Sequence, residues 1–152
     1  MDNVELTTMC AIIDNNRVVM INREKDWPGW AFPGGHLEHK ESLTDCIKRE
    51  VQEETGLIIK TISYKGIVNF YNTCTGKRHI ISNYIAREYC GDLKEKCNEG
   101  TLAWIEISSI SSMLLAEGFE YRLPVFFDEG IKELYIEWDS EQGYTKVVYE
   151  SL

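Results

Sequence analysis

Apolar and polar positions along the chain alternate in short runs, a pattern that is typical of β-strands. Residues 6–13 and 17–22 form two such runs, and the polar triplet 14–16 between them predicts a hairpin. Further strands are predicted over 30–32, 58–71, 78–89, 102–107, 134–138 and 147–149. Loops or turns are expected over 24–29, at 33–35, at Thr75 and Gly76, and at Gln142 and Gly143. The pattern therefore predicts a β-rich chain with few helices.

Residues 43–55 follow a helical pattern instead, and they contain neither proline nor glycine. Ser42, with Asp45 three residues later, is a helix-start signal, and Gly56 is a stop signal. We predict one helix over 43–55 and a second over 120–127. Strands combined with two such helices indicate the α/β class, with a mixed central sheet, although this pattern alone leaves several α/β topologies open. The length of 152 residues suits a single domain.

The first predicted helix carries charged side chains on its inner face. Three residues fall within about 100° of one another and would face the core: Leu43, Cys46 and Ile47. Glu50, Glu53 and Glu54 continue the same stripe. Carboxylates near a helix C-terminus oppose the macrodipole, and two of them about 5 Å apart repel by roughly 3 kcal/mol at an effective dielectric of about 20. A solvated acidic helix is the usual explanation for such residues, but this phase favours a hard divalent cation, Mg²⁺ or Mn²⁺.

Residues 35–57 resemble the Nudix box, G-x5-E-x7-R-E-U-x-E-E-x-G-U, in which U is a bulky aliphatic residue. All nine specified positions match: Gly35, Glu41, Arg49, Glu50, Val51, Glu53, Glu54, Gly56 and Leu57. Nine matches at fixed spacing are a specific signal. The resemblance implies the Nudix α/β/α sandwich over residues 1–152 and a hydrolase that acts on a nucleoside diphosphate linked to another moiety.

The same resemblance implies a role for each box residue. The metal ligands would be Glu50, Glu53, Glu54 and the backbone carbonyl of Gly34. Arg49 and Glu41 would pair and orient the helix. Without the resemblance, Gly34 could be an ordinary loop glycine, and the pair could be a surface ion pair of little energetic value.

A carboxylate from outside the box is expected to complete the site. Glu99, which precedes a glycine and a predicted strand, resembles the residue that does so in MutT-type members, although a Glu-Gly pair there is also common in plain turns. Glu99 is the first candidate for the general base, with Glu53 and Glu41 as alternatives. In the implied mechanism, water attacks phosphorus while a carboxylate accepts its proton and metal ions neutralise the phosphate. No cysteine nucleophile is needed.

Outside the box, the chain resembles small MutT-type enzymes that convert 8-oxo-dGTP or related triphosphates to monophosphate and pyrophosphate. This resemblance implies substrate contacts at Arg23, Phe32 and Arg78, although Phe32 could equally be a core aromatic and the arginines could be solvated. Ala31 and residues 116–120 depart from the family pattern, which in some members has an asparagine and a tryptophan-acidic base clamp at these places. The choice of base therefore stays open.

Three functions follow from these features. The first is a Mg²⁺-dependent nucleoside triphosphate pyrophosphohydrolase. The second is a Nudix hydrolase for another diphosphate, such as ADP-ribose, a dinucleoside polyphosphate or a nucleotide sugar. The third is a nucleotide-sensing Nudix domain without turnover, for which a degenerate box would be expected.

Composition narrows the partners and the compartment. The net charge of −9 argues against binding of a nucleic-acid backbone, which needs a basic surface. Five cysteines without CxxC spacing argue against a zinc site or a disulfide framework and favour a reducing compartment. No leader pattern opens the chain, and its apolar runs are too short to span a bilayer. We therefore expect a cytoplasmic protein that binds a small nucleotide and no membrane, as a monomer or a homodimer.

Overall fold

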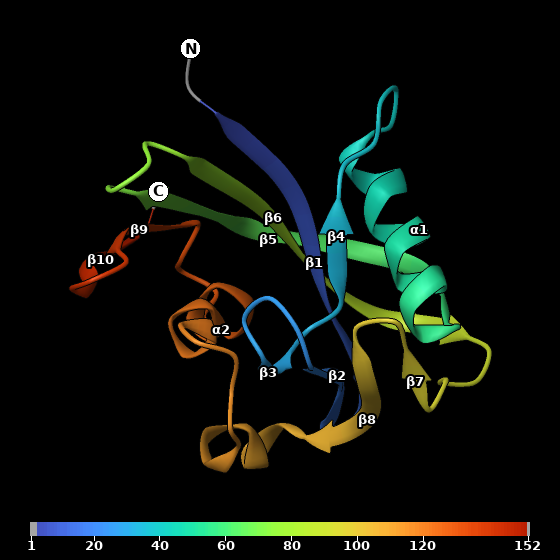
Figure 1. Ribbon diagram of the computed structural model, residues 1–152. Helices are drawn as coiled ribbons and strands as arrows, with labels where there is room; N and C mark the ends of the chain where they lie inside the picture. The colour runs from blue at the N-terminus through green and yellow to red at the C-terminus, as the bar shows by residue number, and fades with distance from the viewer. Residues whose placement is uncertain (1–2, 152) are drawn as a thin grey trace.

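A computed structural model describes residues 3–151, in which ten strands combine with three helical segments (Figure 1). The strands are β1 (Val4–Asp14), β2 (Arg17–Arg23), β3 (Gly29–Ala31), β4 (Gly34–His36), β5 (Ile58–Asn72), β6 (Arg78–Cys90), β7 (Lys96–Cys97), β8 (Gly100–Glu106), β9 (Glu133–Asp139) and β10 (Gly143–Glu150). The helical segments are α1 (Leu43–Thr55), the 3-10 helix η1 (Ile107–Ser112) and α2 (Phe119–Phe127). Neither α1 nor α2, nor any other helix within residues 3–151, is long and apolar enough to cross a membrane.

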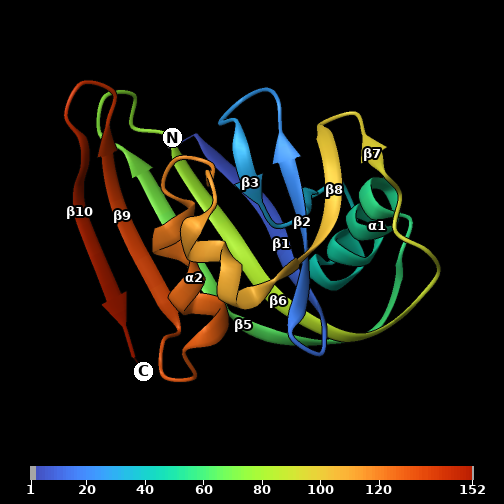
Figure 2. The ribbon, with the colours of Figure 1, turned by 90° about the horizontal axis from the view of Figure 1, so that it is seen from below.

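The strands form a mixed sheet in the order β10-β9-β5-β6-β1-β2-β8-β7, with β3 paired to β2 and β4 paired to β1. The β1–β6 and β5–β9 pairs are parallel, and the other pairs are antiparallel. Figure 2 shows β9 and β10 at one side of the molecule and β7 and β8 at the other. The predicted hairpin between 6–13 and 17–22 is confirmed by the pairing of Ile13 with Val18.

Strand β1 separates the two main parts of the core because its successive side chains point to opposite faces. Cys10 and Ile12 belong to a buried cluster that includes residues of α1. Ala11 and Ile13 belong to a second cluster that includes residues of α2. The two helices therefore cover opposite faces of the sheet (Figures 1 and 2). The predicted α/β class with a mixed sheet is confirmed.

Helix α1 begins and ends at the predicted residues. The Ser42 hydroxyl accepts a hydrogen bond from the Asp45 amide at 3.0 Å, and Gly56 adopts φ 82°, from which its amide bonds the Gln52 carbonyl. The prediction that Leu43 faces the core is wrong, because 37% of its surface is exposed. The buried stripe instead continues toward the C-terminal half of the helix through Cys46, Ile47, Val51, Glu54 and Thr55.

Several strand ends differ from the predicted ones, and three differences lie near the glycines of β4 or in α2. The turn predicted at 33–35 is largely the short strand β4, which lies against β1. A Cβ atom on Gly34 would lie 2.8 Å from the Met9 Cα, so the absence of a side chain lets the two strands approach. The predicted strand 30–32 is shifted by one residue to β3, and the second helix begins one residue early, at Phe119.

Candidate active site

Strand β4 brings two consecutive glycines against carboxylates of α1. The Gly34 amide donates a hydrogen bond of 2.9 Å to Glu54 Oε1, and only 8% of Glu54 is exposed. Next to it, a Cβ atom on Gly35 would lie 2.6 Å from Glu50 Oε1. Any larger residue at either position would displace β1 or a glutamate, so both glycines are needed for this close approach.

Burial and like charge raise the proton affinity of these carboxylates. Burial raises the pKa of Glu54 far above the usual range, and the nearby Glu99 carboxylate raises it further. The pKa of Glu50 is raised by burial and by the charges of Glu53 and Glu99, although Arg49 opposes this shift. The glutamates of α1 and Glu99, which precedes β8, therefore lie in one region of negative charge. A bound cation would relieve this repulsion.

Arg49 is the centre of an ion-pair network along α1. Its Nε and Nη2 donate to the two oxygens of Glu41 at 2.7 and 3.0 Å, so the predicted pair is present with bidentate geometry. Its Nη1 donates to Glu50 at 2.8 Å and to Glu53 at 3.3 Å. Arg49 lowers the pKa of Glu41 to about 2, which makes that carboxylate a weak proton acceptor.

The donor set fits a hard divalent cation in its chemistry, because the predicted ligands offer oxygen atoms. The side chains are not yet arranged as metal ligands. Within residues 3–151, there is no group of three or more histidine, cysteine or acidic side chains placed to hold a metal ion. Arg49 engages Glu50 and Glu53, while Glu54 engages Gly34. For Gly34 the contact seen is through its amide, and ligation by its carbonyl stays a prediction.

A cavity of about 550 Å³ opens beside Gly34 and Glu99 and also contacts two of the predicted substrate residues. The Arg23 Nη1 lies 3.6 Å from Glu99 Oε2, and its Nη2 donates to the Asp26 carbonyl at 3.1 Å. Phe32 is only 2% exposed and packs edge-to-face against two phenylalanines of α2, with ring centroids 4.9 Å apart. It is chiefly a core residue whose surface reaches the cavity.

Arg78, the third predicted contact, does not line this cavity. Its Nη1 donates to Asn69 Oδ1 at 2.7 Å, and its guanidinium lies 4.8 Å from the centre of the Tyr71 ring. The next residue, His79, lines the cavity instead because neighbouring strand residues point to opposite faces. His79 Nε2 lies 2.7 Å from Thr7 Oγ1. Burial, with a smaller contribution from the charge of Arg122, lowers the pKa of His79 to about 4.

Several cavity residues are absent from the predicted site. They include Trp27, Lys77, His79, Arg122 and Tyr144. Arg122 carried a signal in the sequence, since it is the only basic residue of the largely apolar helix α2. Trp27 and Tyr144 carried none, because they come from a loop and from β10 and line one cavity only in the folded chain.

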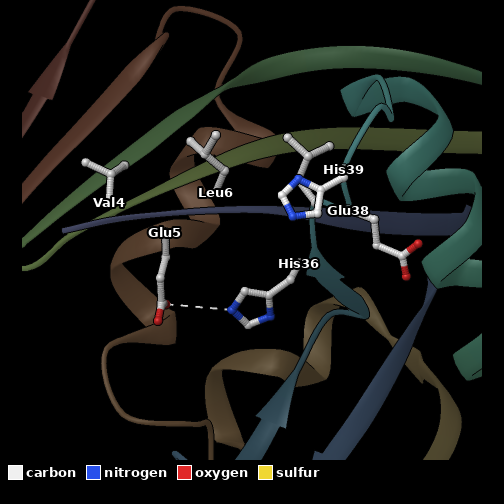
Figure 3. Close-up of a pocket in the computed structure, with 7 residues that line it drawn as sticks. Val4, Glu5, Leu6, His36, Glu38 and His39 are labelled. Carbon is white, nitrogen blue, oxygen red and sulfur yellow. Dashed lines mark ion pairs between the residues drawn. The ribbon is translucent and has the colours of Figure 1, made fainter.

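A second, more open depression of about 750 Å³ lies along β1 and the segment that follows β4 (Figure 3). Figure 3 shows the Glu5 and His36 side chains pointing toward each other, with the His36 Nε2 3.7 Å from Glu5 Oε2. Both residues also line the 550 Å³ cavity. The depression itself contacts neither Glu99 nor the box glycines, so it is separate from the carboxylate cluster.

Comparison with known proteins identifies the family of this chain. The model of the NUDIX domain family matches residues 5–126, and the chain belongs to this family. It is a Nudix hydrolase with MutT-type relatives, a class that acts on phosphoanhydride bonds of nucleotides and generally uses divalent metal ions.

Particular relatives place the chain more closely. The Nudix hydrolase YvcI of Bacillus subtilis is 29% identical over 124 residues, which cover 78% of this chain and 76% of YvcI. An 8-oxo-dGTP diphosphatase of Buchnera aphidicola is 36% identical over 61 residues, 40% of this chain and 47% of that protein. The crystal structure of a mutator MutT protein from Bacillus halodurans has a TM-score of 0.83 at 24% identity, and the match covers 96% of this chain and 97% of the other. That structure shows the shared fold.

Proposed function

We propose that this protein is a Mg²⁺-dependent pyrophosphohydrolase that cleaves a nucleoside triphosphate to a monophosphate and pyrophosphate, with 8-oxo-dGTP as one candidate substrate. The observation that carries this proposal is the position of Glu99. It contributes to the crowded carboxylate region of α1 and also lines the cavity that Arg23 shares. The carboxylates that would hold the cation therefore lie next to the 550 Å³ cavity, whose cationic side chains suit a phosphate chain.

In the proposed reaction the chain itself supplies ligands, orientation and a proton acceptor. Glu50, Glu53, Glu54 and Glu99 would hold the cation. A bound Mg²⁺ would supply positive charge that neutralises phosphate oxygens and acidifies water. Arg23 would bind a phosphate oxygen next to Glu99, and Arg49 would keep α1 oriented through Glu41.

Glu99 is the preferred proton acceptor in this proposal because it lines the cavity in which the substrate would lie. Glu53 is the second candidate, since 61% of its side chain is exposed and its 3.3 Å contact with Arg49 is longer than the Arg49 contacts of Glu41 and Glu50. Glu41 suits the role poorly, because its pKa of about 2 holds it ionised with little affinity for a proton. Its proposed role is to position Arg49.

The decisive experiment measures pyrophosphate release from a panel of nucleoside triphosphates with purified protein and Mg²⁺. Glu54→Gln and Glu99→Gln should each lower kcat/KM by about 100-fold or more, since each removes a ligand or a base. Glu141→Gln, at an exposed turn between β9 and β10, makes the same chemical change away from the site and should leave turnover unchanged. Release of orthophosphate alone, or full activity of both site variants, would refute the proposal.

The panel should also contain ADP-ribose, a dinucleoside polyphosphate and a nucleotide sugar. An ADP-ribose pyrophosphatase of Methanocaldococcus jannaschii is 38% identical over 55 residues, and this similarity is the reason to test ADP-ribose. Comparison of 8-oxo-dGTP with dGTP tests the nucleotide-pool role. Equal efficiency for the two would contradict selection of the oxidised base.

A further inference from the structure

The 550 Å³ cavity has a cationic side that the box does not account for. Five basic side chains line it: Arg23, His36, Lys77, His79 and Arg122. Three of them have carboxylate partners, since Lys77 and His36 both pair with Glu5 and Arg23 lies 3.6 Å from Glu99. His79 is held neutral near pH 7 because its pKa is lowered to about 4. Arg122 is the member of this set whose charge needs a separate explanation.

Arg122 makes no ion pair with any residue among 3–151, and its buried Nε has no hydrogen-bond partner there. Burial lowers its pKa, and the positive charge of Arg23 lowers it further. Arg122 is partly buried, and its Nε is taken out of water without a carboxylate, which is unfavourable. A second cation nearby increases that cost. Arg122 also lies in the N-terminal half of α2, where the helix dipole disfavours a cation.

Neighbouring acids do not neutralise Arg122. Glu5 contacts Lys77 and His36, on the side of β1 and β4, and Asp26 engages Arg23 through its backbone carbonyl. Glu117 lines the cavity but is exposed and forms no ion pair with Arg122. Arg122 is therefore a planar, five-donor cation at the cavity wall for which residues 3–151 supply no carboxylate acceptor.

We propose that Arg122 binds the terminal phosphate of a nucleoside triphosphate and so selects triphosphates over diphosphate derivatives that lack a third phosphate. This inference rests on the proposed function, because it takes the hydrolysed bond to lie at Glu99 and Glu54. A phosphate chain that begins at these carboxylates would pass Arg23, which lies 3.6 Å from Glu99, and could then reach Arg122, which lines the same cavity as Arg23. The guanidinium fork matches two oxygens of one phosphate, and a dianion offsets two adjacent cations where a neutral base could not.

The competing assignment for Arg122 is a hydrogen bond to the acceptor edge of a purine. The two assignments are separated by titration calorimetry with Mg²⁺ and nonhydrolysable α,β-methylene nucleotides. Four such ligands are needed: the triphosphate and the diphosphate of guanosine and of cytidine. Wild-type protein should bind both triphosphates more tightly than the matching diphosphates.

Arg122→Gln should weaken binding of both triphosphates by about 10- to 100-fold, the usual worth of hydrogen bonds to a charged group, and leave both diphosphates within about twofold. Arg122→Lys keeps the charge without the fork and should fall between wild type and Arg122→Gln. Arg87→Gln removes the same charge from an exposed position on β6 outside the cavity and should bind all four ligands as wild type does.

Three results would overturn the assignment: equal affinity of wild type for triphosphates and diphosphates, an equal loss for both in Arg122→Gln, or a loss confined to guanosine ligands. If Arg122→Gln does not fold, the wild-type affinity ratio and Arg122→Lys still decide the question. Failure of the proposed function is seen separately, as absence of pyrophosphate release from every triphosphate, because the calorimetry requires no turnover.

Discussion

Replacement of Gly34 by alanine tests the contact between β4 and β1 that positions the box. The added Cβ would overlap the Thr8 carbonyl oxygen, its nearest neighbour, and would lie 2.8 Å from the Met9 Cα and 2.9 Å from the Thr8 carbonyl carbon. Carbon atoms prefer separations of about 3.5–4.0 Å, so β4 must move by at least about 1 Å. Because the obstructing atoms belong to the backbone of a central strand, rotation of a side chain cannot relieve the overlap. The movement would also stretch the hydrogen bond from the Gly34 amide to Glu54.

The expected loss of stability follows from these two effects. Overpacking of a rigid site costs about 1–3 kcal/mol. Weakening one buried hydrogen bond adds about 1 kcal/mol. Gly34→Ala should therefore lower the free energy of unfolding by about 2–4 kcal/mol. The same shift should raise the Mg²⁺ concentration needed for half-maximal activity, because Glu54 loses the group that orients it.

Urea unfolding followed by tryptophan fluorescence measures this change through the transition midpoint. The matched control is Gly130→Ala, whose Cβ would meet nothing closer than Asp128 Oδ1 at 3.5 Å. Its free energy of unfolding should stay within about 1 kcal/mol of wild type. If Gly34→Ala and Gly130→Ala unfold at the same urea concentration with equal slopes, the close approach of β4 to β1 does not require glycine at position 34.

Two further predictions concern titratable groups. Because the pKa of His79 is lowered to about 4 by burial, the unfolded chain binds a proton between about pH 6.5 and 4 that the native protein does not. As the pH falls from about 6.5 to 4, the free energy of unfolding of wild type should therefore fall by up to about 3 kcal/mol more than that of His79→Gln. Urea unfolding at several pH values measures this difference, and parallel pH profiles for the two proteins would contradict it. Burial raises the pKa of the Cys10 and Cys46 thiols, whereas Cys74 and Cys90 are exposed. A thiol reagent at pH 8 should modify Cys74 and Cys90 first, as located by mass spectrometry, and equally fast labelling of Cys10 in the native protein would refute this.

Helix α1 was predictable because all its signals are local. A capping serine, a stop glycine and the 3.6-residue period lie within a few residues of one another, and the observed bounds match the predicted ones. The same holds for the β1–β2 hairpin. The exposed Leu43 shows the limit of the helical period as a predictor of burial. The period identifies which face of α1 is turned to the core, but not how far the core extends along that face.

The close approach of β4 to β1 was not predictable from local signals. A Pro-Gly-Gly sequence favours a turn, yet Gly34 and Gly35 lie in a strand because they allow contact with β1 and with Glu50. The sequence identifies the glycines but does not show which backbone they meet. Similarly, the contact strand was predicted through Arg78, whereas the strand register turns His79 toward the cavity.

The two halves of the site differ in how the sequence encodes them. The carboxylates of α1 lie within five residues of one another, so helical geometry alone brings Glu50 and Glu54 to one face. The cavity wall instead combines Arg23 of β2, His79 of β6 and Arg122 of α2, and their convergence depends on the parallel β1–β6 pairing and on the packing of α2 against the sheet. Parallel register is not set by a short turn, so no local pattern reports it. The reaction class of a family can therefore be inferred from a short motif, whereas the lining of the cavity, which we propose to select the substrate, is seen only in the folded structure.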